Sequence, residues 1–274
     1  MDKWLNKIIC GDCLEVMKDM PDNSIDAVVT DPPYELGFMG KKWGGGFILM
    51  VYFGAAERPN AIHTLAEAGG KRVMISFAEP PSTSCWKLYR EYGMEIIADS
   101  GAFSMWKRGI DLQIEDYMNW ITENDIQQYF NLDVVGDPET TARNQVKMEQ
   151  AGFNPIPVFH FGEPIELMAE LLENYPLVGL GGTVGQPTTV KEQWFRQVFS
   201  LYPQGNFHAL GVANTRLLMQ FPFVSVDSVW WVYKFRDRQV RMSPGNDRKD
   251  EQRARVKHLL GLENNKPTYQ AAML

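Results

Sequence analysis

The feature that most constrains the fold is an alternation of apolar runs and helix-forming stretches, repeated about eight times from residue 47 onward. The repeats follow one another at roughly 20–35 residues, which is typical of strand–helix units in a parallel sheet. At about eight units, parallel strands joined by right-handed helical crossovers close into a barrel. The sequence therefore predicts an α/β fold, a (β/α)8 TIM-type barrel over residues 47–274; the alternative is an open doubly wound sheet. The predicted strands are 48–53, 72–77, 95–98, 129–134, 155–161, 177–180, 207–210 and 223–226, and the predicted helices are 61–68, 84–92, 112–122, 139–151, 165–174, 190–201, 215–220 and 250–260.

Composition is that of a globular protein, with 45% hydrophobic and 22% charged residues in 274. Residues 1–10 contain no apolar signal core, and no apolar run approaches the ~20 residues that cross a bilayer, so we expect a soluble, cytoplasmic protein without a membrane partner. Cys10 and Cys13 form a C-x-x-C, but no second pair follows and Cys85 stands alone. Because a structural zinc site needs four ligands, ordinary packing is the better interpretation and no metal site is expected.

Charge is distributed unevenly around a net value of −7. A basic segment follows Trp230, and a local basic face can hold phosphates on an otherwise acidic protein. We therefore take Trp230, Lys234, Arg236 and Arg238 as candidate nucleic-acid contacts, with stacking on the aromatic ring. The alternatives are a solvated last helix for the basic residues and packing for the tryptophan.

The first 46 residues differ from the rest and precede a glycine run, Gly44-Gly45-Gly46, that reads as a hinge. A short strand, a helix and a buried strand are expected, and the last of these ends in Asp31-Pro32-Pro33-Tyr34. This stretch resembles the start of the amino-methylating DNA methyltransferases of the N4-cytosine/N6-adenine class. In that family the motif accepts hydrogen bonds from the target amino group and stacks on a flipped base. No glycine-rich S-adenosylmethionine loop follows in a suitable context, so we interpret residues 1–46 as a truncated, vestigial methyltransferase head.

Several acids and a histidine fall where the predicted barrel strands end, which is where barrel enzymes carry their reacting groups. Asp99, Asp133, His160 and Asp227 each lie at or just after the end of a predicted strand, and two glycine-rich turns accompany them. Buried carboxylates without salt partners are costly, so several on one rim indicate use. Two carboxylates about 5 Å apart suit retaining glycosyl chemistry, with one as nucleophile and one as acid/base. Each residue also has a structural interpretation, as a turn, a helix cap or a satisfied core histidine.

The ordered motifs 99–104, 181–185, 208–212 and 226–228 resemble those of the tRNA-guanine transglycosylase superfamily over about residues 48–235. The resemblance implies Asp227 as the nucleophile and Asp99 as the general acid/base. It implies a base-binding set made of Asp133, His160, Ser100, Gly101, Phe103, Gly181 and Gly182. His160 stands where the family often has a glutamine, and the family's cysteine zinc lobe is missing because no cysteine follows Cys85.

Shortened members without that lobe occur among phage-type DNA transglycosylases. The expected function is then exchange of guanine for a 7-deazaguanine, in DNA more than in tRNA, without a cofactor. Two alternatives remain open: an S-adenosylmethionine-dependent DNA amino-methyltransferase that uses Asp31–Tyr34, and a catalytically silent DNA-binding module. The sequence leaves the oligomeric state open.

Overall fold

The computed structural model describes residues 49–212, 214–232, 248–263 and 267. The chain divides into two units between Gly45 and Gly46, and every described residue belongs to the second. The methyltransferase-like motif Asp31–Tyr34 and the cations Lys234, Arg236 and Arg238 lie outside the described residues. Within the described part, no helix is both long and apolar enough to span a membrane.

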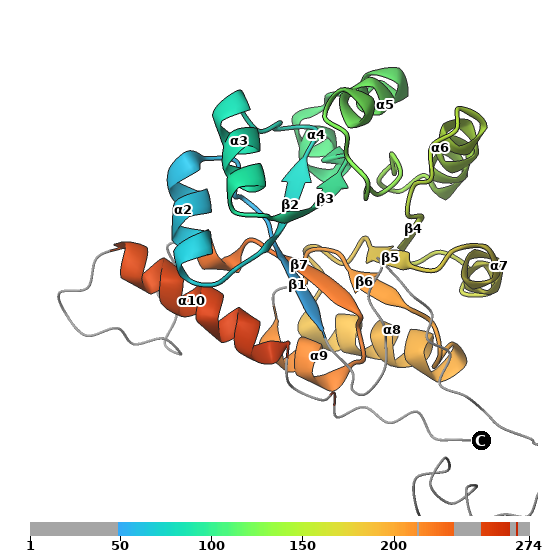
Figure 1. The fold of residues 1–274 in the computed structure, drawn as a ribbon. Helices are drawn as coiled ribbons and strands as arrows, with labels where there is room; N and C mark the ends of the chain where they lie inside the picture. Colours follow the sequence, from blue (N-terminus) through green and yellow to red (C-terminus); the bar gives the residue numbers. More distant parts are fainter. Residues whose placement is uncertain (1–48, 213, 233–247, 264–266, 268–274) are drawn as a thin grey trace, which may run out of the picture. The chain divides into compact units, whose positions relative to one another are not determined.

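The described chain is an α/β fold built on a curled, parallel, seven-stranded sheet (Figure 1). The strand order is β3-β2-β1-β7-β6-β5-β4, so the first and last strands of the chain are neighbours. The strands are β1 (Met50–Phe53), β2 (Arg72–Ser76), β3 (Glu95–Asp99), β4 (Val158–His160), β5 (Val178–Gly181), β6 (Phe207–Ala209) and β7 (Ser225–Ser228). The helices are α2 (Pro59–Glu67), α3 (Thr83–Glu91), α4 (Ala102–Arg108), α5 (Ile114–Glu123), α6 (Pro138–Gln150), α7 (Leu167–Asn174), α8 (Thr188–Leu201), α9 (Thr215–Gln220), the 3-10 turn η2 (Trp230–Val232) and α10 (Arg248–Leu262).

The fourth predicted strand, at residues 129–134, does not form as a strand. Instead, Tyr129 bridges to Ala98 beside β3, and Phe130 bridges to Ile156 just before β4, both in parallel. Four backbone hydrogen bonds of 2.8–2.9 Å carry these bridges, and they link the two edge strands of the sheet. Residues 49–263, apart from the undescribed gaps, therefore form seven strands where eight were expected. The Asn131 N–H still donates to the Ile156 carbonyl at 2.9 Å, and after it the chain runs to Asp133 without strand pairing.

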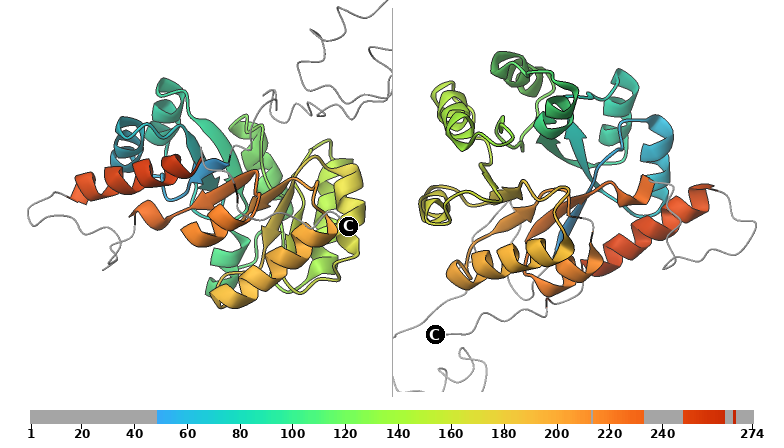
Figure 2. Two further views of the ribbon diagram at one scale, coloured as in Figure 1. Left: turned by 90° about the horizontal axis from the view of Figure 1, so that it is seen from below. Right: turned by 180° about the vertical axis from the view of Figure 1, so that it is seen from behind.

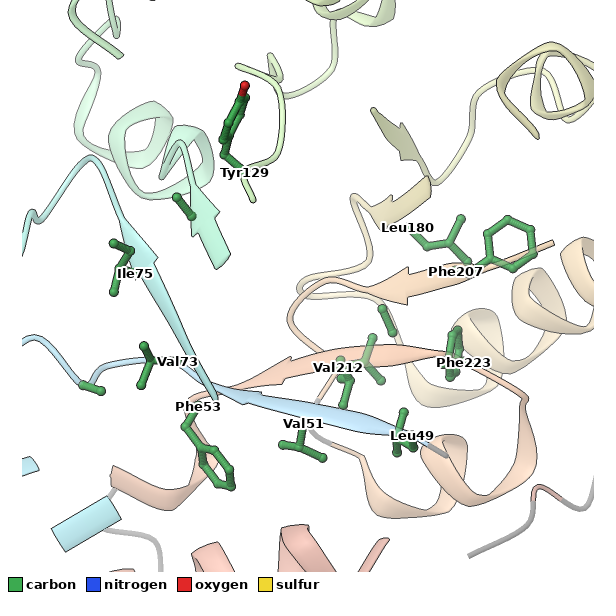
Figure 3. Close-up of a cluster of buried hydrophobic side chains, with 14 of the residues drawn as sticks. Leu49, Val51, Phe53, Val73, Ile75, Tyr129, Leu180, Phe207, Val212 and Phe223 are labelled. Atoms are coloured by element: carbon green, nitrogen blue, oxygen red, sulfur yellow. The ribbon is translucent and has the colours of Figure 1, made fainter. Parts of the chain in front are cut away.

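Both faces of the sheet are covered, as the continuous apolar runs predicted. Leu49, Val51 and Phe53 alternate along β1 and project to one side, into a cluster of buried side chains (Figure 3). The intervening Tyr52 points to the other side, where its ring lies 6.0 Å from that of His208. The helices lie outside the sheet, with α10 packed beside α2 and α9 (Figure 2).

Local sequence explains where α6 begins. Asp137 caps α6 by accepting from the Thr140 N–H at 2.9 Å, and Pro138 takes the first helical position. Helix α4 was not predicted, because its seven residues contain no apolar face that the fold buries. Two residues separate α4 from the end of β3, which carries Asp99. The site is therefore bordered by a helix that hydrophobic periodicity could not predict.

Candidate acid-rich site at the carboxyl ends of the strands

A cavity of about 960 Å³ opens at the carboxyl ends of the strands. Asp99 ends β3, His160 ends β4, Gly181 ends β5 and Asp227 lies in β7. The structure thus brings most of the candidate residues to one place, although they come from strands spread across the sheet. The cavity is lined by Asp99, Gly101, Phe103, Asp133, His160, Gly181, Gly182 and Asp227, among others. Ser100 is fully buried behind this wall and reaches it through Asp133.

Asp99 is the most perturbed acid of the site. Burial raises the pKa of its carboxyl group to about 7, and the charges of Asp133 and Asp227 add to the rise. A hydrogen bond from the Gly101 N–H to Oδ2, at 2.9 Å, opposes the rise without cancelling it. Near neutral pH, Asp99 therefore carries a proton in a substantial fraction of molecules, which suits a proton donor.

Asp133 is held by a chain of side chains. Its Oδ1 accepts from the Ser100 hydroxyl at 3.1 Å, and its Oδ2 lies 3.0 Å from His160 Nε2. The other ring nitrogen of His160, Nδ1, lies 3.0 Å from Glu163 Oε1. Burial alone would lower the pKa of His160, but the two carboxylates raise it to about 9. His160 is therefore a cation at neutral pH, and both of its nitrogens are already engaged.

Asp227 is buried and is oriented from behind. Its Oδ1 accepts from the Gly211 N–H at 2.6 Å, and His208 Nε2 lies 3.5 Å from the same oxygen. His208 is fully buried, and its Nδ1 lies 2.8 Å from the Ser225 hydroxyl. If Nε2 carries the ring proton, that proton faces the carboxylate and Nδ1 accepts from Ser225, although Nε2 makes no hydrogen bond within the described residues. Both contacts fall on Oδ1, which leaves Oδ2 as the oxygen of Asp227 without a protein partner in the described part.

Two glycines of the site are required by close packing. Gly101 has a φ of +76°, and a Cβ there would lie 2.3 Å from Ala78 Cβ. Gly182 has a φ of +73°, and a Cβ would lie 3.0 Å from the Phe161 nitrogen. The turn at Gly182 is therefore packed against the end of β4.

Trp230 lies away from this cavity. Its ring contacts His258 at 5.8 Å between centroids, and the Arg255 guanidinium lies 5.2 Å from it. This arrangement matches the packing alternative, and the role of Trp230 in nucleic-acid binding stays a prediction. Within the described residues, no group of three or more histidines, cysteines and acids is arranged to hold a metal.

Sequence reasoning did not select four residues that the structure places at or behind the site. Glu163 and His208 orient His160 and Asp227, and Trp106 and Lys107 line the cavity from α4. Glu163 carried a weak signal, since it follows a candidate histidine by three residues. His208 lies within one of the compared motifs, yet nothing in the sequence alone shows that its ring faces Asp227.

Comparisons with known proteins give relatives that are named as methyltransferases and a methylase. No model of a known protein family matches the chain. A type II methyltransferase, M.ScaI of Streptomyces caespitosus, is 27% identical over 167 residues, which is 55% of this chain and 54% of that protein. M.BglII of Bacillus subtilis is 56% identical over 32 residues, or 12% of this chain and 9% of that protein. The putative methylase YubD of Escherichia coli is 42% identical over 38 residues, or 14% and 17%. The chain spans about half the length of the first relative and less of the others.

Two solved structures are similar to this chain in fold alone. A protein solved as native KDPGal has a TM-score of 0.50 at 12% identity, covering 81% of this chain and 97% of that chain. A protein of Aquifex aeolicus has a TM-score of 0.52 at 11% identity, covering 80% and 94%.

The transglycosylase resemblance drawn from the sequence is wrong. The relatives are named as methyltransferases and a methylase, and none of these relatives or solved structures is named as a transglycosylase. Short motifs of glycine, aspartate and small residues recur wherever parallel strands end in tight turns, so their order reflected the barrel-like fold more than a shared ancestry. The 7-deazaguanine, tRNA and phage assignments lose their support with it.

Proposed function

We propose that this protein is an enzyme that modifies bases in DNA, and that its reaction is methyl transfer from S-adenosylmethionine to a base amino group. The three relatives support this proposal through their names. The stretch similar to M.ScaI equals 55% of the chain, about three times the length of residues 1–46. The similarity to a DNA methyltransferase therefore reaches beyond the segment that carries Asp31-Pro32-Pro33-Tyr34, and this motif is the candidate for contacts to the target amino group.

S-adenosylmethionine needs a glycine loop whose backbone groups can line it, and at the candidate turn Gly181–Gly182 a Cβ would meet His160 and Phe161. This packing alone gives no contact to the cofactor. For this reason we derive no step of the reaction from the described site, and we assign the methyl-transfer role to Asp31–Tyr34 only.

The test is transfer of label from methyl-labelled S-adenosylmethionine to duplex and single-stranded DNA by the full chain. We expect incorporation at an amino group of adenine or cytosine, and loss of incorporation in Asp31→Ala. Asp227→Asn serves as a second variant, because it leaves the motif intact. Absence of both cofactor binding and label transfer by the wild-type chain, with its fold verified by circular dichroism, would exclude methyl transfer.

A second role is favoured by the cavity itself. One observation carries it: Asp99, with its pKa raised to about 7, shares a cavity with Asp227. We propose that the cavity moves protons on a nucleobase-containing substrate: Asp99 donates its proton to one substrate atom, Asp227 Oδ2 accepts a proton from another, and Asp133 accepts hydrogen bonds from the base edge. Titration of nucleosides into the protein tests this, since Asp133→Ala should weaken binding about 10-fold, as expected for loss of a hydrogen bond to a charged group. Equal binding by the wild type and Asp133→Ala would refute the base-recognition role.

A further inference from the structure

Helix α4 is unusual because none of its side chains is buried, although it borders the cavity. Its two flanking residues, Gly101 and Gly109, both adopt left-handed backbone conformations. Phe103, Trp106 and Lys107 are spaced i, i+3 and i+4, so they share one face of the helix, and all three line the cavity. The fold therefore presents this face to whatever enters the cavity.

Trp106 is 58% exposed, and folding gives no reason for a tryptophan there. Its ring stacks on Phe103 at an interplanar angle of 26° and a centroid distance of 6.1 Å. Lys107 Nζ lies 4.3 Å from the centre of the Phe103 ring. The neighbouring Arg108 pairs with Glu79, whereas Lys107 forms no ion pair with any described residue. An exposed aromatic stack with a cation beside it is the arrangement that binds single-stranded nucleic acid.

Charge is divided along the cavity in a way that matches a nucleotide. The inner wall carries Asp99, Asp133 and Asp227, whose oxygens suit the N–H groups of a base edge. The α4 face carries aromatic rings and an ammonium group, which suit a neighbouring base and its phosphate. At about 960 Å³ the cavity is at the upper end of ligand sites, so it has room for more than one base.

We propose that the α4 face formed by Phe103, Trp106 and Lys107 binds single-stranded or locally opened DNA: one base enters the cavity, the adjacent base stacks on Trp106, and a phosphate pairs with Lys107. This inference rests on the proposed action on DNA, and it adds the surface that holds the strand beside the cavity. It also differs from the sequence-based assignment, which put nucleic-acid contacts on Trp230 and the segment after it.

Photo-crosslinking of the full chain to single-stranded DNA carrying 5-iododeoxyuridine tests the placement directly. We expect the cross-linked peptide, identified by mass spectrometry, to contain Phe103 or Trp106. Cross-links found solely in peptides outside residues 102–108 would overturn the proposal, even if the protein binds DNA tightly. An RNA of the same sequence is the comparison, and preferential cross-linking of RNA at this helix would also overturn it.

Binding of a fluorescein-labelled single-stranded DNA, followed by anisotropy, gives the energetic test. Because stacking on an aromatic side chain is lost, Trp106→Ala should raise Kd by about 5- to 150-fold, and Trp106→Phe should recover most of the loss. Lys107→Ala should reduce the slope of log K against log salt by about 0.7. The controls are Leu201→Ala, 54% exposed at the end of α8, and Lys87→Ala, exposed on α3.

The outcomes separate the inference from the function on which it rests. If the wild-type chain binds no DNA, the proposed action on DNA fails and this surface fails with it. If the wild-type chain binds DNA but Trp106→Ala and Lys107→Ala behave like their controls, the α4 proposal alone is refuted. Since α4 buries no side chain, both variants are expected to fold, which circular dichroism verifies.

Discussion

Replacing Asp99 by asparagine should make the free energy of unfolding depend less on pH. The folded state raises the pKa of Asp99 from 3.8 to about 7, so the folded protein binds this proton more tightly than the unfolded chain. Stability from this proton is fully present below about pH 4 and is lost as pH rises through 7. At 1.36 kcal/mol per pKa unit, the loss approaches about 4 kcal/mol, an upper limit because Asp133 and Asp227 interact with the same proton.

Asparagine isolates this effect because its shape is similar to that of aspartate. Its amide oxygen can still accept the hydrogen bond that the Gly101 N–H donates to Asp99 Oδ2 at 2.9 Å in the wild type. The assay is urea unfolding of the wild type and Asp99→Asn at half-unit steps from about pH 4 to 8.5. We expect the free energy of unfolding of the wild type, minus that of the variant, to fall by about 2–4 kcal/mol over this range and to level off above pH 8. Asp111→Asn, an exposed acid outside the cavity, is the matched control.

A flat difference between wild type and Asp99→Asn across the range would refute the reasoning, since the carboxyl group would then have the same proton affinity in both states. A difference that rises with pH would refute it more strongly, because it would mean that the folded state favours the charged form.

The site makes three further predictions. Because the pKa of His160 is raised from 6.5 to about 9, its contribution to stability is present below pH 6.5 and is lost as pH rises through 9. In urea unfolding, the free energy of unfolding of the wild type minus that of His160→Gln should fall by up to about 3 kcal/mol over that window. An unchanged difference would disprove the contact of His160 with both carboxylates. Gly101→Ala should lower the free energy of unfolding by about 2–5 kcal/mol, because φ is +76° and Ala78 blocks the Cβ; a loss below about 0.5 kcal/mol would contradict the observed loop. His208→Ala should cost about 2–4 kcal/mol in the same assay, since the ring fills the space between Tyr52 and Phe130, and a stable variant would show that this space can collapse.

Sequence periodicity predicted most of the fold because strand and helix repeats carry their own pattern. Seven of the eight expected strands form, each close to its predicted position. The exception, residues 129–134, was predicted from apolar content alone, yet only Tyr129 and Phe130 pair with neighbours. The chain then runs to Asp133 without strand pairing, and no local pattern encodes where the pairing stops.

In the candidate site, too, the sequence predicts the residues at the strand ends but not the side chains that they contact. Asp99, His160 and Asp227 could be predicted because polar residues at strand ends meet at one rim of a parallel sheet. Their partners could not be predicted, since the contacts of Glu163 and His208 depend on how β4, β6 and β7 lie beside one another. Helix α4 escaped for a different reason, because a short helix without a buried face leaves no periodic signal.

The two-residue link at Tyr129 and Phe130 is a place where the sheet is expected to open locally. Between β1 and β7 the sheet is joined by a full ladder, whereas β3 and β4 are joined through only a few backbone hydrogen bonds. Asp99 ends β3 on one side of this link, and His160 ends β4 on the other side. Asp133 lies in the segment that follows the link. Local opening of this link would widen the space between these side chains while β1 and β7 stay paired, so access to the acids is expected to depend on it.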